Sequence, residues 1–478
     1  MFRFTNISAY HQDLLNGQTT CVEAVRHYLA TIANEQDLNV WLEVFTNEAL
    51  QRAAELDDKR NEKGLLGKLH GVVIGIKDVL AYSGHQLSAS SKMLEGFTSI
   101  FSATAIERLL AEGAIIIGRQ NCDEFAMGSS NENSAFGAVK NAADKTKVPG
   151  GSSGGSAVAV QAGMCMLSLG SDTGGSVRQP ADFCGLVGFK PSYGRISRYG
   201  LIAYASSFDC IGLLANTIED VSIALEVIAG ADEFDSTVSN KEVPAYSSNL
   251  TVHAKPRKLV YFKQAVENES LDPEIKAAFL SFIKSLTDAG HSVQSIDFEL
   301  IDYIVPTYYI LTTAEASSNL SRYDGVRYGH RTKTDNPNLT EMYALSRSEG
   351  FGKEVKRRIM LGNFVLSAGY FDAYFTKAQQ VRQLLHQQIT SIFQEFDLLI
   401  SPTVPATAWS FGEKSKDPTA MYLADIYTVL ANLTGIPAVS LPLFKHSNGM
   451  PFGLQVMASA LDELSLLQFS AGLMPKKQ

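Results

Sequence analysis

Two glycine- and serine-rich loops form the part of this sequence whose residue types best suit chemistry. Residues 150–156 read GGSSGGS, and residues 170–180 read GSDTGGSVRQP. The surrounding residues 150–212 hold 13 of the chain's 37 glycines, and residues 148–189 contain only three charged side chains. Such a composition is typical of a tightly packed core or of a site where the backbone approaches a ligand closely.

Three known kinds of glycine-rich site fit these loops poorly. A P-loop requires a lysine directly after its last glycine, and neither loop has one. A dinucleotide-binding fingerprint follows a strand, whereas residues 141–146 (NAADKT) do not predict one. Residues 150–154 match the G-x-S-x-G nucleophile elbow, but residues 147–149 are a poor strand to precede it. Ordinary turns remain the alternative for either loop taken alone.

Composition and charge narrow the class of protein. The chain has 478 residues, of which 45% are hydrophobic and 19% are charged, which predicts a folded protein with a large core. The net charge of −9 argues against nucleic-acid binding by this chain alone. No apolar stretch reaches the length of a membrane-spanning helix, and the polar start lacks the apolar core of a signal peptide. We therefore expect a cytoplasmic protein that does not contact a membrane.

The cysteines and histidines predict neither disulfides nor a metal site. Five cysteines are an odd number, they lack C-x-x-C spacing, and most lie among apolar residues. The nine histidines show no paired-ligand spacing. We expect small buried thiols in a reducing compartment and no bound metal.

Hydrophobic periodicity predicts helices that alternate with short strands. Helices are expected over residues 21–34, 46–63 and 103–112, and a further helix of small residues over 157–163, after the first loop. Strands are expected over residues 72–76, 114–117, 258–262, 292–296, 398–401, 439–443 and 452–457. This alternation is typical of an α/β fold with a mixed, mostly parallel, twisted central sheet that helices flank on both faces.

Two longer motifs make the sequence resemble a known enzyme family. The second loop ends in GGSVRQPA over residues 174–181, and GVVIGIKD over residues 71–78 places Lys77 at the end of an expected strand. Both motifs are similar to those of the amidase signature family. The similarity covers nearly the whole chain and is greatest to the glutaminase subunits of the aspartyl/glutamyl-tRNA amidotransferases. Four further segments support it, at residues 91–95, 123–129, 192–200 and 354–362.

The resemblance implies one large catalytic domain with the amidase signature fold. Residues 1–64 would form an N-terminal helical segment, and residues 65–231 the core that carries the catalytic loops. Residues 257–478 would supply the remainder of the same fold, with a helix-rich insertion over about residues 300–395. The polar, uneven residues 232–255 are the expected joint between the two halves.

The resemblance also implies a catalytic set of two serines and one lysine. Ser176 is implied as the nucleophile that forms the acyl ester and Lys77 as the terminal base. Ser152, implied to follow a cis peptide bond, would be the bridging serine between them. Glycines allow the backbone to approach a developing oxyanion closely. We expect the oxyanion hole to consist of the backbone N–H groups of Thr173, Gly174, Gly175 and Ser176.

A lysine base needs surroundings that remove its charge. Its usual pKa is about 10.4, and burial lowers it because the ammonium form loses its hydration. The charge-poor segment meets this need. Asp78 would keep the proton on Lys77 if the two side chains met, but neighbouring strand residues point to opposite faces, so we expect Asp78 to face away. Asp172 and Arg178 flank the second loop and, as buried charges, are expected to be paired, with each other as one arrangement.

A glutamine pocket needs one anionic and one cationic side chain, because free glutamine carries an α-ammonium and an α-carboxylate. The resemblance implies Asp425 and Arg358 for these roles. It implies Tyr309 as the residue that closes the pocket, with Tyr308 as the alternative, and Ser129 as a lining residue.

The resemblance further implies a heterotrimer. A larger partner that binds tRNA and ATP and a small third polypeptide would join this chain, which hydrolyses glutamine. The released ammonia would convert Glu-tRNA(Gln) into Gln-tRNA(Gln), and conversion of Asp-tRNA(Asn) into Asn-tRNA(Asn) stays open as a second reaction. ATP and Mg²⁺ are expected on the tRNA-binding partner, with no cofactor on this chain.

Two alternative functions stay open. One is a free-standing amidase of the same fold that acts on small amides; an apolar pocket in place of Arg358 and Asp425 would be typical of it. The other is a non-catalytic scaffold protein, against which the complete set of Lys77, Ser152 and Ser176 argues.

Overall fold

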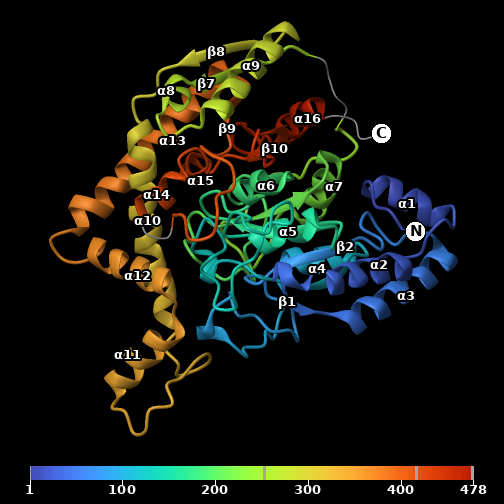
Figure 1. The fold of residues 1–478 in the computed structure, drawn as a ribbon, viewed down its shortest axis with the longest axis horizontal. Helices are drawn as coiled ribbons and strands as arrows, with labels where there is room; N and C mark the ends of the chain where they lie inside the picture. The colour runs from blue at the N-terminus through green and yellow to red at the C-terminus, as the bar shows by residue number, and fades with distance from the viewer. Residues whose placement is uncertain (1, 251–254, 415–417, 475–478) are drawn as a thin grey trace.

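The described residues of this computed structural model form one mixed sheet of eleven strands (Figure 1). The structure describes residues 2–250, 255–414 and 418–474. The spatial order of the strands is β1-β3-β2-β4-β6-β5-β10-β11-β9-β7-β8. Their bounds are β1 Trp41–Val44, β2 Val73–Lys77, β3 Ile115–Gln120, β4 Leu167–Asp172, β5 Val187–Lys190, β6 Cys210–Ala215, β7 Lys258–Phe262, β8 Ser292–Ile296, β9 Leu398–Pro402, β10 Ala438–Lys445 and β11 Pro451–Met457.

Sixteen α-helices surround this sheet within the described ranges. They are α1 Ile7–Leu15, α2 Cys21–Asn34, α3 Thr46–Lys63, α4 Thr104–Ala111, α5 Gly154–Gln161, α6 Arg178–Cys184, α7 Ile218–Ile228, α8 Lys263–Glu267, α9 Pro273–Asp288, α10 Ile301–Asn319, α11 Leu339–Gly350, α12 Lys353–Val365, α13 Lys377–Glu395, α14 Pro418–Leu423, α15 Val429–Thr434 and α16 Glu463–Leu473.

The sheet is mixed, as expected, but parallel pairs do not predominate in it. Four of the ten pairings are parallel; they join β3, β2 and β4 near one end and β9, β7 and β8 at the other. The strands between these groups, and the edge strand β1, pair antiparallel. The physical reason is clearest at β10 and β11, because the residues 446–450 that connect them are too few for a parallel crossover.

Helices cover both faces of the sheet because its inner strands are apolar on both sides. Every residue of β2, β3, β4 and β6 is buried, which requires cover above and below them. One group of helices, α5 and α6, packs on β2, β4, β5 and β10. A second group, α7 and α16, packs on β6 and β10. The expected flanking of the sheet by helices is therefore confirmed.

Several predicted elements coincide with observed ones. Residues 21–34 and 46–63 are α2 and α3, and residues 258–262 and 292–296 are β7 and β8. The helix expected over residues 157–163 is α5, which begins earlier, at Gly154. The strands β4, β5 and β6 were not predicted, because their glycine, serine and cysteine residues dilute the β-branched signal. The expected joint covers residues 232–255, of which the structure describes residues 232–250 and Lys255. Residues 232–250 contain no helix or strand.

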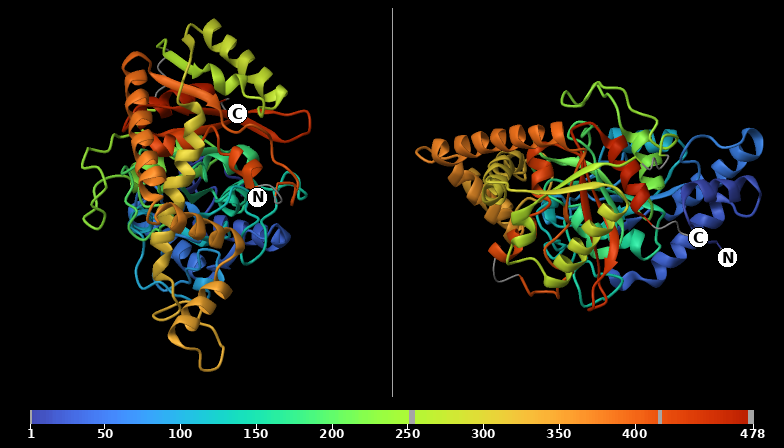
Figure 2. Two further views of the ribbon diagram at one scale, coloured as in Figure 1. Left: turned by 90° about the vertical axis from the view of Figure 1, so that its left-hand side faces the viewer. Right: turned by 90° about the horizontal axis from the view of Figure 1, so that it is seen from above.

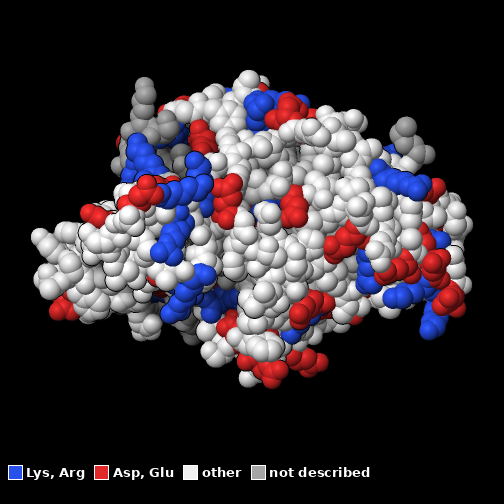
Figure 3. Space-filling model, turned by 90° about the horizontal axis from the view of Figure 1, so that it is seen from below, with Lys and Arg blue, Asp and Glu red and all other residues white. Residues whose placement is uncertain are grey.

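The helix-rich insertion of the C-terminal half is present as α10 to α13. The long helix α10 runs along one side of the molecule, and the turn between α12 and α13 protrudes from it (Figures 1 and 2). This corner carries few charged side chains, as the left-hand projection in Figure 3 shows. Its exposed large apolar side chains are Met360, Leu361, Phe364, Tyr370, Phe371 and Tyr374.

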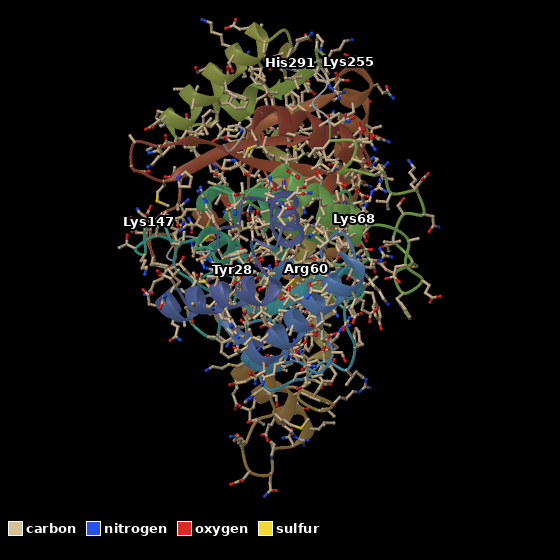
Figure 4. The ribbon with its side chains drawn as sticks, turned by 90° about the vertical axis from the view of Figure 1, so that its right-hand side faces the viewer. Tyr28, Arg60, Lys68, Lys147, Lys255 and His291 are labelled. Carbon is tan, nitrogen blue, oxygen red and sulfur yellow. The ribbon has the colours of Figure 1, made fainter. Side chains whose placement is uncertain are left out.

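The N-terminal helices lie on the side of the molecule away from this corner (Figure 4). Tyr28 of α2 and Arg60 of α3 are labelled there. Tyr28 is buried with Cys21, and all five cysteines of the chain are buried and free. None of the helices in the described ranges is both long and apolar enough to span a bilayer.

Candidate active site

Lys77 is the last residue of β2 and lies in a fully buried setting of hydroxyl groups. Its side chain has no exposed surface. Its Nζ lies 2.7 Å from Ser152 Oγ, 3.0 Å from Ser153 Oγ and 2.9 Å from Ser171 Oγ. Burial lowers the pKa of Lys77 below its usual value. The structure therefore provides the surroundings that a neutral lysine needs.

The hydrogen bonds around Lys77 restrict which serine can face its lone pair. The Ser153 hydroxyl donates to the Ser171 carbonyl oxygen at 3.1 Å, so Ser153 Oγ can only accept from the amine. A neutral amine has two hydrogens and one lone pair. One hydrogen is thus directed to Ser153, and the second hydrogen and the lone pair are shared between Ser152 and Ser171. The arrangement with the lone pair toward the Ser152 hydroxyl is the one that suits proton transfer from Ser152 to Lys77.

Asp78 turns away from Lys77, as the strand periodicity predicts. Its carboxylate accepts hydrogen bonds from the backbone N–H groups of Ser88 (3.0 Å) and Ser90 (2.6 Å). It also forms an ion pair with Arg119. Asp78 is thus neutralised by another cation and does not hold a proton on Lys77.

The loop that carries Ser152 packs closely against the buried residue Asp123, whose backbone N–H bonds to the loop. The Gly151–Ser152 peptide bond is cis, as the family resemblance implies. Asp123 donates its N–H to the Ser152 carbonyl (3.1 Å) and accepts from the backbone N–H of Asn131 (2.9 Å) and Asn133 (3.0 Å). A Cβ at Gly151 would lie 2.1 Å from Asp123 Oδ2, so this position requires glycine.

Ser176 lies on the second loop, two residues before α6. The two loops are joined by a hydrogen bond from the Ser153 N–H to the Ser176 carbonyl oxygen, at 3.1 Å. Ser176 is 9% exposed, and its hydroxyl has no hydrogen-bond partner among the described residues, Ser152 included. The geometry therefore brings Lys77 and Ser152 into direct contact, and it joins the backbone of Ser176 to that of Ser153, the neighbour of Ser152.

Asp172 and Arg178 form a bidentate ion pair with each other, and both are fully buried. Arg178 Nε and Nη2 donate to the two Asp172 oxygens at 3.0 and 2.9 Å. Asp172 also accepts from the N–H groups of Gly175 (2.9 Å) and Val177 (3.2 Å), which fixes the shape of the second loop. Burial raises the pKa of Asp172, but the Arg178 charge overcomes this effect and holds that pKa below its usual value.

The glycines of the second loop allow other segments to approach it closely. A Cβ at Gly174 would lie 2.3 Å from Tyr308 Oη, and a Cβ at Gly175 would lie 2.3 Å from Thr428 Oγ1. Gly175 also has a φ of +126°, which side-chain-bearing residues rarely adopt. Tyr308 therefore lies against the expected oxyanion hole.

The four residues expected in the glutamine pocket lie together. Asp425 accepts hydrogen bonds from Ser129 Oγ (2.9 Å) and Tyr309 Oη (2.7 Å). Arg358 Cζ lies 5.5 Å from the centre of the Tyr309 ring, which also stacks on the ring of Tyr422. Burial raises the pKa of Asp425 to about 6, so this carboxylate is ionised at neutral pH. Of the two tyrosines considered, Tyr309 contacts Asp425.

Arg358 is a buried residue of α12 and not part of an exposed basic run. It is 3% exposed, and its Nε donates to Glu354 Oε1, one helical turn earlier, at 2.9 Å. Its Nη1 donates to Tyr204 Oη at 2.7 Å. Arg358 lines a pocket of about 540 Å³ together with Glu354 and Tyr422. One cation and one anion, Arg358 and Asp425, therefore flank the same tyrosine ring.

Some residues of the site were not anticipated. Ser153 and Ser171 contact Lys77, and both lie inside the two loops whose composition drew attention, so a search of those loops for further hydroxyl groups would have found them. Tyr204 contacts Arg358, and Asp209 contacts Thr173. No local sequence signal marks them, because their contacts depend on how distant segments pack.

The sequence of this chain is similar to those of known amidases and amidotransferase subunits. A sequence profile described as Amidase matches residues 23–467. The chain is 48% identical over 471 residues to the glutamyl-tRNA(Gln) amidotransferase A subunit of Chlorobaculum parvum, with 98% of each chain covered. It is 49% identical over 450 residues to that of Koribacter versatilis, with 94% of this chain and 93% of the relative covered.

Solved structures show the same likeness. The crystal structure of the glutamyl-tRNA(Gln) amidotransferase A subunit from Thermotoga maritima is 35% identical and superimposes with a TM-score of 0.80 over 99% of this chain and 98% of that chain. The native peptide amidase of Stenotrophomonas maltophilia is 25% identical, with a TM-score of 0.81 over 98% of this chain and 96% of that chain. This chain therefore belongs to the amidase signature family.

Proposed function

We propose that this chain is the glutaminase subunit of a tRNA-dependent amidotransferase. The observation that carries the proposal is the fully buried Lys77 amine at 2.7 Å from the Ser152 hydroxyl, on a loop whose next residue, Ser153, bonds to the backbone of Ser176. The similar curated proteins are named as subunits of glutamyl-tRNA(Gln) amidotransferases, which supports the choice of reaction.

In the proposed reaction, Ser176 Oγ attacks the side-chain amide carbon of glutamine. The hydroxyl proton passes to Ser152, whose own proton passes to the neutral Lys77. The C–N bond of the amide then breaks, the nitrogen takes a proton from the same relay, and ammonia leaves. Water attacks the acyl ester by the same proton path, releases glutamate and restores Ser176.

The oxyanion of each tetrahedral intermediate would be bound by backbone N–H groups of Thr173, Gly174 and Ser176. The fourth expected donor, the N–H of Gly175, already donates to Asp172 Oδ1 at 2.9 Å and is not free for this role. The hydrogen bonds from the Gly175 and Val177 N–H groups to Asp172 support a loop of fixed shape. Donors that are already oriented need no reorganisation when charge develops.

The substrate's charged groups would be bound by the two buried side chains of the pocket. Asp425, with Ser129 and Tyr309, would receive the α-ammonium, and Arg358 would receive the α-carboxylate. The presence of this pair favours glutamine over an apolar amide, and so it favours the amidotransferase role over a free-standing amidase. Both parts of the chain, residues 65–231 and residues 257–478, contribute side chains to the site, which supports one catalytic domain.

The complex is part of the proposal. The larger partner would bind tRNA, ATP and Mg²⁺ and activate Glu-tRNA(Gln), and a small third polypeptide would complete a cytoplasmic heterotrimer. This chain would bind no cofactor of its own. Ammonia from Ser176 would then be consumed on the tRNA-binding partner, with Asp-tRNA(Asn) as a second substrate to be tested in the same assay.

The test compares Ser176→Ala with wild type, each as the full chain co-expressed with the partner subunits. We expect the variant to lose glutamate release from glutamine while its thermal unfolding is unchanged. Ser391→Ala, on the exposed face of α13, is the matched control and should keep full activity. More than a trace of activity in Ser176→Ala would defeat the nucleophile assignment. Hydrolysis of small amides but not of glutamine by wild type would favour the free-standing amidase.

A further inference from the structure

We infer that residues 204–209, here called the strap, tie the oxyanion loop to the carboxylate-binding arginine, with Asp209 and Tyr204 as positioning residues. The inference rests on the proposed function, in which Thr173 belongs to the oxyanion hole and Arg358 binds glutamine. The strap precedes β6, and the pairing of Asp172 with Cys210 in the sheet brings Asp209 beside Thr173.

Asp209 holds the oxyanion loop at one end of the strap. It is 3% exposed, and the Thr173 hydroxyl donates to its Oδ1 at 2.7 Å. Its Oδ2 accepts from the backbone N–H groups of Tyr204 (3.0 Å) and Ala205 (3.1 Å). One carboxylate therefore fixes both the side chain of Thr173 and the backbone from which Tyr204 extends.

Tyr204 holds Arg358 at the other end of the strap. Arg358 Nη1 donates to Tyr204 Oη at 2.7 Å, and Arg358 Cζ lies 5.6 Å from the centre of the Tyr204 ring. Tyr204 is 2% exposed, so its ring has little freedom to move. The path Thr173–Asp209–Tyr204–Arg358 thus consists of buried hydrogen bonds and one short stretch of backbone.

Two helices of the helix-rich insertion, α10 and α13, form hydrogen bonds with the strap. Glu315 of α10 accepts from the N–H (2.9 Å) and the hydroxyl of Ser207. Arg382 of α13 donates to the Ser207 carbonyl and hydroxyl oxygens, both at 2.8 Å. Asn319 of α10 donates to the Tyr204 carbonyl oxygen at 3.2 Å. Because its two ends and its middle are anchored, the strap sets a fixed spacing between Thr173 and Arg358.

This spacing matters because glutamine joins the two places by covalent bonds. Its amide oxygen must reach the oxyanion loop while its α-carboxylate lies at Arg358. A misplacement of about 1 Å at either place can cost on the order of 10²-fold in rate. The strap would therefore align the amide of an amino-acid substrate through its carboxylate.

The experiment measures steady-state hydrolysis of two amides by the full chain in its complex. The amides are glutamine and 4-aminobutanamide, which is glutamine without its α-carboxylate. Tyr204→Phe keeps the ring and removes only the acceptor for Arg358. We expect it to raise KM for glutamine about tenfold, because a hydrogen bond to a charged group is lost. Its kcat for glutamine should fall as well, because the amide is then less well aligned with the oxyanion loop. Both constants for 4-aminobutanamide should stay as in wild type.

Asp209→Asn should act on both ends of the strap. We expect kcat to fall about 10²-fold for both amides, since an oxyanion donor is displaced, and KM to rise for glutamine alone. Asp57→Asn is the matched control, because Asp57 also accepts two backbone N–H bonds, from Cys21 and Val22, far from the site. Thermal unfolding of each variant separates loss of fold from loss of alignment.

Two results would overturn the inference. One is an equal effect of Tyr204→Phe on the two amides, since that would disconnect Tyr204 from carboxylate binding. The other is an Asp209→Asn variant whose kinetic constants match those of Asp57→Asn. Failure of the proposed function looks different: wild type would then hydrolyse 4-aminobutanamide or other simple amides but not glutamine, and the kcat effect of Asp209→Asn on those amides would still test the strap.

Discussion

Replacing Arg178 with methionine should destabilise the fold and disable the second loop together. Methionine has a similar length and no charge, so the change removes five hydrogen bonds without opening a large cavity. Two of these go to Asp172, and the others go to Thr428 O, Asn432 Oδ1 and Gln455 Oε1. Asp172 would remain as a buried carboxylate without its cation.

The expected loss can be worked from the contacts that remain. Removing one partner of a buried pair typically costs about 3–5 kcal/mol. Asp172 would keep three donors, from the N–H groups of Gly175 and Val177 and from Asn432 Nδ2. These donors partly satisfy the carboxylate, so we expect a loss near the lower end, about 3 kcal/mol.

The pH dependence of this loss has a definite sign. In wild type the Arg178 charge holds the pKa of Asp172 below its usual value, so the pair stabilises the fold above the unfolded pKa and this contribution is lost on acidification. Without Arg178, burial dominates and raises the pKa of Asp172 above its unfolded value. The variant's Asp172 then binds a proton as pH falls, so the difference in stability should be largest at neutral pH and should narrow toward pH 5.

Urea unfolding of wild type and Arg178→Met at pH 7.5 and pH 5 measures both effects. Arg195→Met is the control, because Arg195 forms a comparably buried ion pair with Glu463 at 3.1 Å, away from the second loop. Arg195→Met should lower the free energy of unfolding by a similar amount, but its folded fraction should keep the wild-type kcat. Arg178→Met should lower both the free energy of unfolding and kcat. Equal unfolding midpoints and equal kcat for wild type and Arg178→Met would refute the reasoning.

Four further predictions concern Lys77, Asp425 and Ser153. Burial lowers the pKa of Lys77, so kcat/KM should rise with pH through that pKa and level off below pH 10.5; a rate that is flat with pH would argue against a lysine base. Lys77→Met should abolish hydrolysis yet raise the thermal midpoint at neutral pH, because it removes a buried amine that favours the unfolded state when protonated. Asp425→Asn should raise KM for glutamine far more than it changes stability, and wild-type KM should rise as pH falls through about 6; an unchanged KM would remove Asp425 from the pocket. Ser153→Ala should lower kcat about tenfold, because the amine loses the acceptor that orients its lone pair; full activity would show that Ser171 alone orients it.

The sequence predicts the chemistry of this site better than its surroundings. Lys77, Ser152 and Ser176 lie in contiguous motifs, so local spacing and family resemblance suffice to single them out. The orientation of Asp78 follows from the two-residue period of a strand. The cost of burying an isolated charge predicts that Asp172 and Arg178 are each paired, with each other as one arrangement, and the structure shows that arrangement.

The contacts around the site and the directions of the strands depend on tertiary packing, which no local sequence pattern encodes. Asp209 lies beside Thr173 only because β4 and β6 pair with Asp172 opposite Cys210. Strand direction was misjudged for the same reason. Alternation of helices and strands predicts parallel pairing, but β10 and β11 follow one another directly and enter the middle of the sheet antiparallel to β5 and β9.

That late arrival at the centre of the sheet has a consequence for synthesis on the ribosome. β5 ends at Lys190, and its neighbour β10 begins at Ala438. At elongation rates of about 5–20 residues per second, the growing chain carries an unmatched strand edge on the order of 10–50 s. Asp425 also emerges in this last stage, so an unfinished polypeptide lacks a complete substrate pocket. Removal of β10 and β11 would accordingly take two strands from the middle of the sheet, a larger loss than the fraying that removal of a terminal segment usually causes.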